Sequence, residues 1–246
     1  MAIDLGKKAN PEDLEFLNGH ANDTLEGFEQ VRTDTMAIPF IRLLQTLSPQ
    51  LDKTEASHIP GAEKGMWFNT LTKELYGEEF KCIVLKFERI YIEWKPNRGG
   101  FVSYHSVENA EQIAVDRTFG KWKTLDGNDL QENYVYMILI AGHEKEGPCV
   151  LSLSSSGIKA AKEWNRLMMM NIMPNGQRAK PYYMIWNVKA VAQKNDQGSW
   201  YAPKMSFVDY INADQYALAK TERLALPSRQ VDYTQLEAKI EDETSF

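Results

Sequence analysis

Apolar and polar residues alternate along much of the chain between residues 65 and 210, which predicts a protein rich in β-strands. These runs are also rich in aromatic and β-branched side chains, as half-buried strands usually are. The expected strands are Met66–Asn69, Phe80–Phe87, Arg89–Trp94, Phe101–Tyr104, Tyr134–Ala141, Cys149–Leu153, Tyr182–Gln193 and Trp200–Tyr210. Helical spacing of apolar residues predicts helices at Gly157–Ile172 and Asp214–Leu226, the second of which is ended by Pro227.

The order of these elements predicts the fold class. The strands do not alternate regularly with helices, so parallel β-α-β units are not expected and the sheet should be antiparallel. We therefore expect a β-rich α+β protein built on an OB-like (oligonucleotide-binding) antiparallel β-barrel with helical insertions. A generic α+β sandwich is compatible with the same pattern.

Charge is distributed unevenly along the 246 residues. Residues 1–30 carry a net charge of −5 and residues 229–246 one of −3, so the total of −6 leaves +2 for residues 31–228. We expect an acidic N-terminal extension at 1–30, a single OB-like nucleic-acid-binding domain at 31–228 and a flexible, disordered acidic C-terminal tail at 229–246. A mildly basic body argues against clamping duplex DNA by bulk charge but permits a local cationic groove.

The overall composition, with 43% hydrophobic and 25% charged residues, is typical of a soluble globular protein. No apolar run approaches about 18 residues, and the N-terminus lacks the apolar core of a secretory signal, so no membrane association is expected. Cys82 and Cys149 are isolated and are expected to be reduced, structural cysteines. The four histidines stand apart in the sequence and suggest no metal cluster, and no cofactor is expected: His20, His58, His105 and His143.

Cations and flat rings share the strand faces that are expected to be exposed. Single-stranded nucleic acid requires both, because Lys and Arg neutralise phosphates while aromatic rings stack on unpaired bases. The candidate DNA-binding residues from strands and their turns are Arg89, Tyr91, Lys95, Arg98, Phe101, Tyr104, Tyr183, Lys189, Trp200 and Lys204, and those from an expected loop are Lys121, Trp122 and Lys123. Most aromatic residues of a protein this size belong to its core, and Trp94 and Trp186 are expected there.

The helix expected at Gly157–Ile172 divides its side chains sharply between two faces. Its apolar stripe consists of Ile158, Ala161, Trp164 and Met168. The opposite face carries Lys159, Lys162, Glu163 and Arg166, and its three cations complete the set of candidate DNA-binding residues. One of the serines at 154–156 is expected to cap the helix with its side chain.

Sequence motifs of common catalytic sites, including the phosphate-binding loop and the dinucleotide-binding glycine pattern, are absent. One enzymatic alternative rests on Glu79, Glu93 and Lys95, which resemble the acid and E-x-K half of a restriction-type nuclease motif. In such a site two acids hold Mg²⁺ and the lysine aids the attacking water. We expect the protein not to be an enzyme, with a Mg²⁺-dependent nuclease as the catalytic alternative.

Residues 237–246, E-A-K-I-E-D-E-T-S-F, combine acidic side chains with an aromatic residue at the end of the chain. A second set of characteristic segments lies within residues 31–210. It consists of M-A-I-P-F-I-R-L-L-Q-T-L-S-P (36–49), G-M-W-F-N-T-L-T-K-E-L-Y-G (65–77) and I-E-W-K-P-N-R-G-G-F (92–101). Together they resemble bacteriophage single-stranded DNA-binding proteins, which have OB barrels and acidic tails ending in Phe. The resemblance implies that Glu241, Asp242, Glu243 and Phe246 recruit replication partners and cover the DNA groove when DNA is absent.

The sequence thus favours sequence-tolerant binding of single-stranded DNA in phage DNA replication, recombination or repair, in the cytoplasm of the bacterial host. Expected partners are single-stranded DNA and, through the tail, a DNA polymerase or a helicase; assembly into a homo-oligomer is left open. The alternatives are a strand-annealing recombination mediator, the Mg²⁺-dependent nuclease and a phage structural or interaction protein.

Overall fold

The computed structural model describes residues 37–96, 99–118, 121–196, 198–228 and 231–234, together with Pro11 and Glu15. Contacts divide the chain into two units, Met1–Met36 and Ala37–Phe246, and every element named below belongs to the second. The strands are β1 (Ile41–Leu43), β2 (Trp67–Asn69), β3 (Leu75–Gly77), β4 (Glu79–Trp94), β5 (Phe101–Ser106), β6 (Ala114–Thr118), β7 (Lys121–Thr124), β8 (Asp129–Ile140), β9 (Cys149–Ser154), β10 (Met184–Asn195) and β11 (Gly198–Tyr210). The helices are α2 (Val107–Ile113), α3 (Gly157–Met170) and α4 (Ala213–Ala225), with short 3-10 helices η2 (Pro49–Leu51), η4 (Glu144–Glu146), η5 (Pro181–Tyr183) and η6 (Leu226–Ser228).

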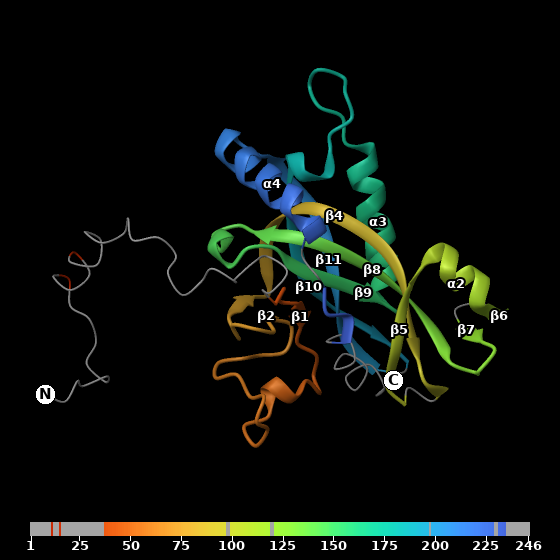
Figure 1. The fold of residues 1–246 in the computed structure, drawn as a ribbon. Coiled ribbons are helices and arrows are strands. Elements are labelled where there is room, and N and C mark those ends of the chain that lie inside the picture. The colour runs from red at the N-terminus through yellow and green to blue at the C-terminus, as the bar shows by residue number, and fades with distance from the viewer. Residues whose placement is uncertain are drawn as a thin grey trace, which may run out of the picture. The chain divides into compact units, whose positions relative to one another are not determined.

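Most of the strands form one antiparallel sheet of eight strands. Its order is β11-β10-β4-β8-β7-β6, with β5 beside β4 and β9 beside β8, while β1, β2 and β3 form a separate three-stranded sheet. The large sheet curls into a half-barrel, and β4 arches across it in Figure 1. This arrangement confirms the expected β-rich α+β fold. Within the described residues, no helix combines the length and the apolar character needed to cross a bilayer.

Strand β4 runs unbroken for 16 residues, so the expectation of two strands at Phe80–Phe87 and Arg89–Trp94 is wrong. Its register against β8 shifts between Val84 and Lys86, where one extra residue forms a bulge. Because side chains alternate with period two, the extra residue moves later even-numbered positions to the opposite face. Val84 therefore joins one core cluster and Ile90 the other. The change of phase in the sequence reflects this bulge and does not mark a strand end.

The two core clusters lie on the two faces of the large sheet. Helix α3 packs on one face through Ala161, Trp164 and Met168, and α4 contributes Ala219 to the cluster on the other face. The stripe predicted for α3 is therefore essentially confirmed, although Ile158 is only half-buried. The predicted alternation along β10 is also confirmed, since Met184, Trp186 and Val188 are buried while the intervening side chains are more exposed.

Several local expectations are corrected by the structure. Ser156 occupies the position before α3, but its side chain makes no capping hydrogen bond, so the expected serine cap is wrong. Residues 121–123, expected in a loop, belong to strand β7, which pairs with β6 and β8. Cys82 and Cys149 are both buried and free, as expected for structural cysteines, and burial raises the pKa of both thiols.

Residues 37–45, which we call the edge strap, contact two strands that have open edges. Phe40 forms a parallel bridge with Val150 of β9, and the amide of Val150 donates to the carbonyl of Pro39 at 2.8 Å. At its other end, the side chain of Gln45 donates from Nε2 to the carbonyl of Tyr201 and accepts from its amide, at 3.0 and 2.9 Å. The amide side chain thus takes the place of a neighbouring strand for one residue of β11.

We expect Gln45→Ala to lower the free energy of unfolding by about 1–3 kcal/mol, because it leaves both backbone groups of Tyr201 without this partner. Urea denaturation followed by circular dichroism measures the change. Gln50→Ala is the matched control, because Gln50 bonds Ile59 and His58 through its backbone carbonyl, which the substitution keeps. Equal midpoints for the two variants would contradict the role assigned to Gln45.

Candidate nucleic-acid interface

The face of β4 that was expected to be open to DNA is covered by the segment containing α2, β6 and β7. Tyr91 is buried there with Ala110 and Leu130, against half-buried Trp122. The rings of Tyr91 and Trp122 are stacked at 4.7 Å with an angle of 18° between their planes. The expected exposure of Tyr91 is therefore wrong, because period two along one strand does not reveal which later segment folds over it.

Two arginines extend this stack of rings. Arg117 lies 5.3 Å from the centre of the Trp122 ring, and Arg89 lies 5.7 Å from that of Tyr91. Arg89 also pairs with Glu132 at 2.5 Å and donates to the Tyr91 hydroxyl at 3.0 Å. Burial and the charge of Glu132 raise the pKa of Tyr91, so its phenol stays neutral. These contacts make the stack a packed structural element whose two arginines are exposed.

The acid proposed for a nuclease site is engaged elsewhere. Glu93 is buried and accepts hydrogen bonds from His105 Nε2 at 2.7 Å and Asn128 Nδ2 at 2.6 Å. Glu79 begins the same strand, which at about 3.3 Å per residue separates the two acids by on the order of 40 Å. Glu79 instead pairs with Lys189 at 3.4 Å. Glu79 and Glu93 therefore cannot hold one Mg²⁺ ion, and the E-x-K pattern has a structural explanation.

The other candidate residues divide between packed and exposed positions. Phe101 packs on Trp94 with ring centres 5.9 Å apart, and Lys123 pairs with Asp129 at 3.1 Å. Tyr104 is 53% exposed, with its ring 4.5 Å from that of Tyr233. The side chains of Lys95, Lys159, Lys162, Arg166, Lys189 and Lys204 are exposed, and that of Trp200 is half-buried. Arg98, the side chain of Lys121 and the tail residues Glu241, Asp242, Glu243 and Phe246 lie outside the described part of the chain.

Tyrosines and cations gather where η5 packs against α4. Among the described residues, this group combines aromatic rings and positive charge more densely than the candidates above. We call it the cation–tyrosine cluster, and it consists of Lys180, Tyr182, Tyr183, Tyr216, Lys220 and Arg223. The rings of Tyr182 and Tyr216 are stacked at 6.4 Å and 26°, and that of Tyr183 stands edge-on to both. Tyr182 is buried, Tyr183 is half-buried and Tyr216 is 37% exposed, so the group runs from the core to the surface.

The cations of this cluster lie close to its rings. The Arg223 guanidinium is 4.9 Å from the centre of the Tyr182 ring, and Lys180 Nζ is 6.0 Å from the same ring and 5.8 Å from Tyr183. Lys220 Nζ is 5.9 Å from the Tyr216 ring. Among the residues that the structure describes, none of these three cations forms an ion pair with a carboxylate. Within the described part of the chain, their charge is therefore not neutralised by an ion pair.

Sequence reasoning had selected only Tyr183 from this cluster. One further signal was present, because Tyr216, Lys220 and Arg223 occur at i, i+4 and i+7 of the predicted helix and so share one of its faces. Their meeting with Lys180 and Tyr182 depends on the packing of α4 against η5, which no local pattern encodes.

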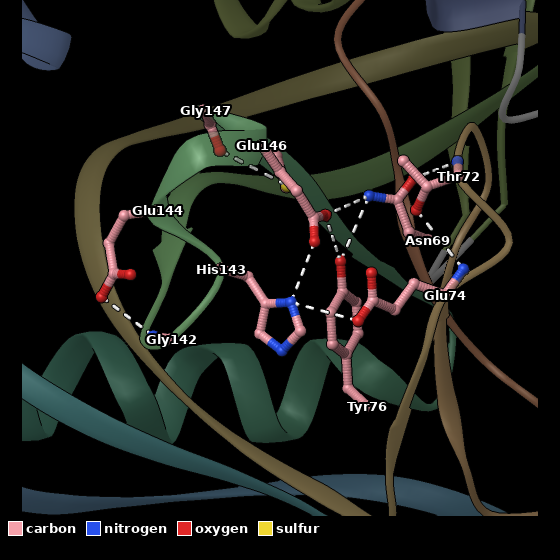
Figure 2. A network of polar contacts seen from close by, with 10 residues as sticks. Asn69, Thr72, Glu74, Tyr76, Gly142, His143, Glu144, Glu146 and Gly147 are labelled. Atoms are coloured by element: carbon pink, nitrogen blue, oxygen red, sulfur yellow. Dashed lines mark hydrogen bonds and ion pairs between the residues drawn. The ribbon is translucent and has the colours of Figure 1, made fainter. Parts of the chain in front are cut away.

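A second polar group joins the β2–β3 hairpin to the loop between β8 and β9. We call it the polar clasp, and it comprises Asn69, Glu74, Tyr76, His143 and Glu146 (Figure 2). Glu146 Oε2 accepts from Tyr76 at 2.6 Å and from Asn69 at 2.8 Å, while its Oε1 accepts from His143 Nδ1 at 2.9 Å. Burial opposes ionisation of Glu146, but these hydrogen bonds outweigh it and lower its pKa. His143 thus has two carboxylates beside it, although the histidines stand apart in the sequence.

We expect Glu93→Gln to lower the free energy of unfolding by about 1–3 kcal/mol, because an amide has one acceptor oxygen and can keep Asn128 only by turning its own donor to His105, whose Nε2 must then accept. Thermal and urea unfolding measure this change. The control is Glu79→Gln. This acid is exposed, so its substitution is expected to leave the unfolding midpoint unchanged. A Glu93→Gln protein as stable as its parent would contradict the structural role of this acid.

Comparison with known proteins places the chain in one family. A family model described as Pam3 phage gp34-like protein matches residues 6–232, which is most of the chain. No curated protein matches the chain, and no solved structure does. The matched range includes every strand and helix of the large sheet. The chain belongs to the Pam3 phage gp34-like protein family.

Proposed function

We propose that this phage protein binds single-stranded DNA without sequence preference, in phage DNA replication or recombination, as the single-stranded DNA-binding proteins that its sequence resembles do. The observation that carries the proposal is the cation–tyrosine cluster. Phosphates would contact Lys180, Lys220 and Arg223, whose charges form no ion pair within the described residues. Bases would stack on the exposed ring of Tyr216 and on Tyr183, with about 1–3 kcal/mol per stacked base.

The exposed face of α3 is a second basic surface that would contact DNA. Lys159, Lys162 and Arg166 are all exposed on one side of this helix, whose other side packs on the sheet. Single-stranded DNA can contact such a surface through its phosphates alone, without aromatic rings, since nonspecific affinity comes mainly from phosphate neutralisation. We assign α3 to backbone contacts and the cation–tyrosine cluster to base stacking.

The curled antiparallel sheet is compatible with an OB-like barrel, which is the architecture we propose for this family. The acidic residues Glu241, Asp242 and Glu243 would compete with DNA for the basic surfaces and, with Phe246, would recruit a DNA polymerase or helicase. We place this activity in the cytoplasm of the bacterial host, where phage DNA is copied.

We expect Tyr216→Ala to weaken binding of oligo-dT by roughly 5- to 150-fold, which corresponds to the loss of one stacked base.

The double variant Lys220→Ala, Arg223→Ala should reduce the slope of log affinity against log salt by about 1.4, because two phosphate contacts are lost. Fluorescence anisotropy of labelled oligo-dT at several salt concentrations measures both effects, with Mg²⁺ present and the DNA checked for cleavage.

The matched control is Lys53→Ala, which removes an exposed lysine from the turn after η2, outside the cluster. It should leave both the affinity and the salt slope unchanged. If all variants, including Lys53→Ala, weakened binding equally, the effect would reflect the overall charge of the protein and not the cluster. If the parent protein showed no salt-sensitive binding, the interaction-protein alternative would be favoured. Duplex DNA of equal length is the comparison ligand and should bind more weakly than oligo-dT.

Removing residues 237–246, which carry a net charge of −3, should strengthen oligo-dT binding several-fold at low salt. The gain should disappear at high salt, because screening removes the competition between tail and DNA. The same titration measures it, and a full-length control with Glu241→Gln, Asp242→Asn and Glu243→Gln separates charge from length. Unchanged affinity in both variants at low salt would contradict autoinhibition by the tail.

A further inference from the structure

Three potential metal-ligand atoms converge at the polar clasp, on a part of the fold that the DNA-binding proposal does not use. His143 Nδ1 lies 2.9 Å from Glu146 Oε1 and 3.4 Å from Glu74 Oε1, and one ligand atom from each residue lies within 4.8 Å of the others. Figure 2 shows the imidazole directed at both carboxylates. A tetrahedral ion bound at about 2.0–2.1 Å from its ligands needs ligand atoms roughly 3.3 Å apart. The two separations from His143 are therefore close to the spacing that such an ion requires.

The atoms behind these ligands fix their orientation. Glu146 directs Oε2 to Tyr76 and Asn69, which leaves Oε1 for the converging group. Asn69 is fully buried, and its own Oδ1 accepts from the amides of Leu71 and Thr72, so its position is fixed by the hairpin. The Tyr76 ring stands edge-on to His143 at 4.8 Å and limits the rotation of the imidazole. Hydrogen-bonded partners of this kind raise metal affinity by holding ligands in place.

We propose that Glu74, His143 and Glu146 bind one divalent transition-metal ion of the zinc class. The ion would take the place of the proton on His143 Nδ1 that is otherwise shared with the two carboxylates. Two carboxylates and a neutral imidazole bring a charge of −2, which balances the ion. Imidazole suits Zn²⁺ and its neighbours better than Mg²⁺, so the site should discriminate between them.

The bound ion would crosslink two distant parts of the chain. Glu74 directly precedes β3, whereas His143 and Glu146 lie in the loop that connects β8 to β9. The side chain of Glu74 is 46% exposed, so the fourth position of a tetrahedral ion would face solvent and take a water molecule. The ion would stabilise the small sheet against the large one, because it binds the folded chain only.

Isothermal titration calorimetry of the full chain, freed of metal by a chelator, tests the proposal with ZnCl2 and with MgCl2. One equivalent of Zn²⁺ should bind, Mg²⁺ should not bind at the same concentration, and Zn²⁺ should raise the melting temperature. Glu74→Gln should weaken Zn²⁺ binding at least about 10-fold and abolish the thermal shift. This substitution tests the ligand without disturbing the fold, since among the described residues the Glu74 carboxylate pairs with His143 alone.

Glu144→Gln is the matched control, because Glu144 is an exposed acid of the same loop that only accepts from the Gly142 amide. It should bind Zn²⁺ as the parent does. Co²⁺ should give a visible absorption band in the parent and in Glu144→Gln but not in Glu74→Gln. Absence of Zn²⁺ binding by the parent, or equal binding by Glu74→Gln, would overturn the proposal. Oligo-dT affinity, measured with and without Zn²⁺, reports separately on the proposed function.

Discussion

The extra residue in the middle of β4 determines which side chains of this strand meet which core. Without it, Ile90 and Ile92 would point to the face occupied by Val84 instead of joining the cluster beneath α4. Before the bulge, ordinary alternation sends Val84 to one core and Ile83 to the other, and the bulge reverses this assignment for the residues that follow. After the bulge, Ile90 and Ile92 of β4 thus pack in the cluster to which α4 contributes Ala219.

A curled sheet that does not close leaves strand edges whose backbone groups need partners. The edge strap provides such partners, at β9 beside Phe40 and at β11 through the side chain of Gln45. The polar clasp then holds the hairpin that follows the strap against the loop before β9, with buried Asn69 at its centre. Residues 37–77 therefore stabilise the large sheet from outside it, through these polar contacts and through Ile38, Phe40, Ile41 and Trp67, which pack in its core clusters.

The sequence predicted what depends on local periodicity and missed what depends on packing between distant segments. The buried stripe of α3 around Trp164 and the alternation of β10 around Trp186 were predictable, because one face of each element meets the core. The burial of Tyr91 was not, since the segment that covers it begins some 15 residues later and shows only weak periodicity. The approach of His143 to Glu74 was equally hidden, because turn geometry and sheet register bring the two residues together.

The proposed function depends on the charge of the cation–tyrosine cluster. Lys180 and Arg223 share the ring of Tyr182, so their like charges repel, and no carboxylate of the described residues pairs with either. A purely structural cluster would gain by exchanging one of these cations for a neutral side chain, whereas contact with the ring returns only part of the cost at an exposed site. The stack at Trp122 differs in part, because Arg89 is paired with Glu132 and Tyr91 is buried there, although Arg117 has no carboxylate partner among the described residues. Under the proposed DNA binding, phosphates would supply the charge that these cations do not find among the described residues.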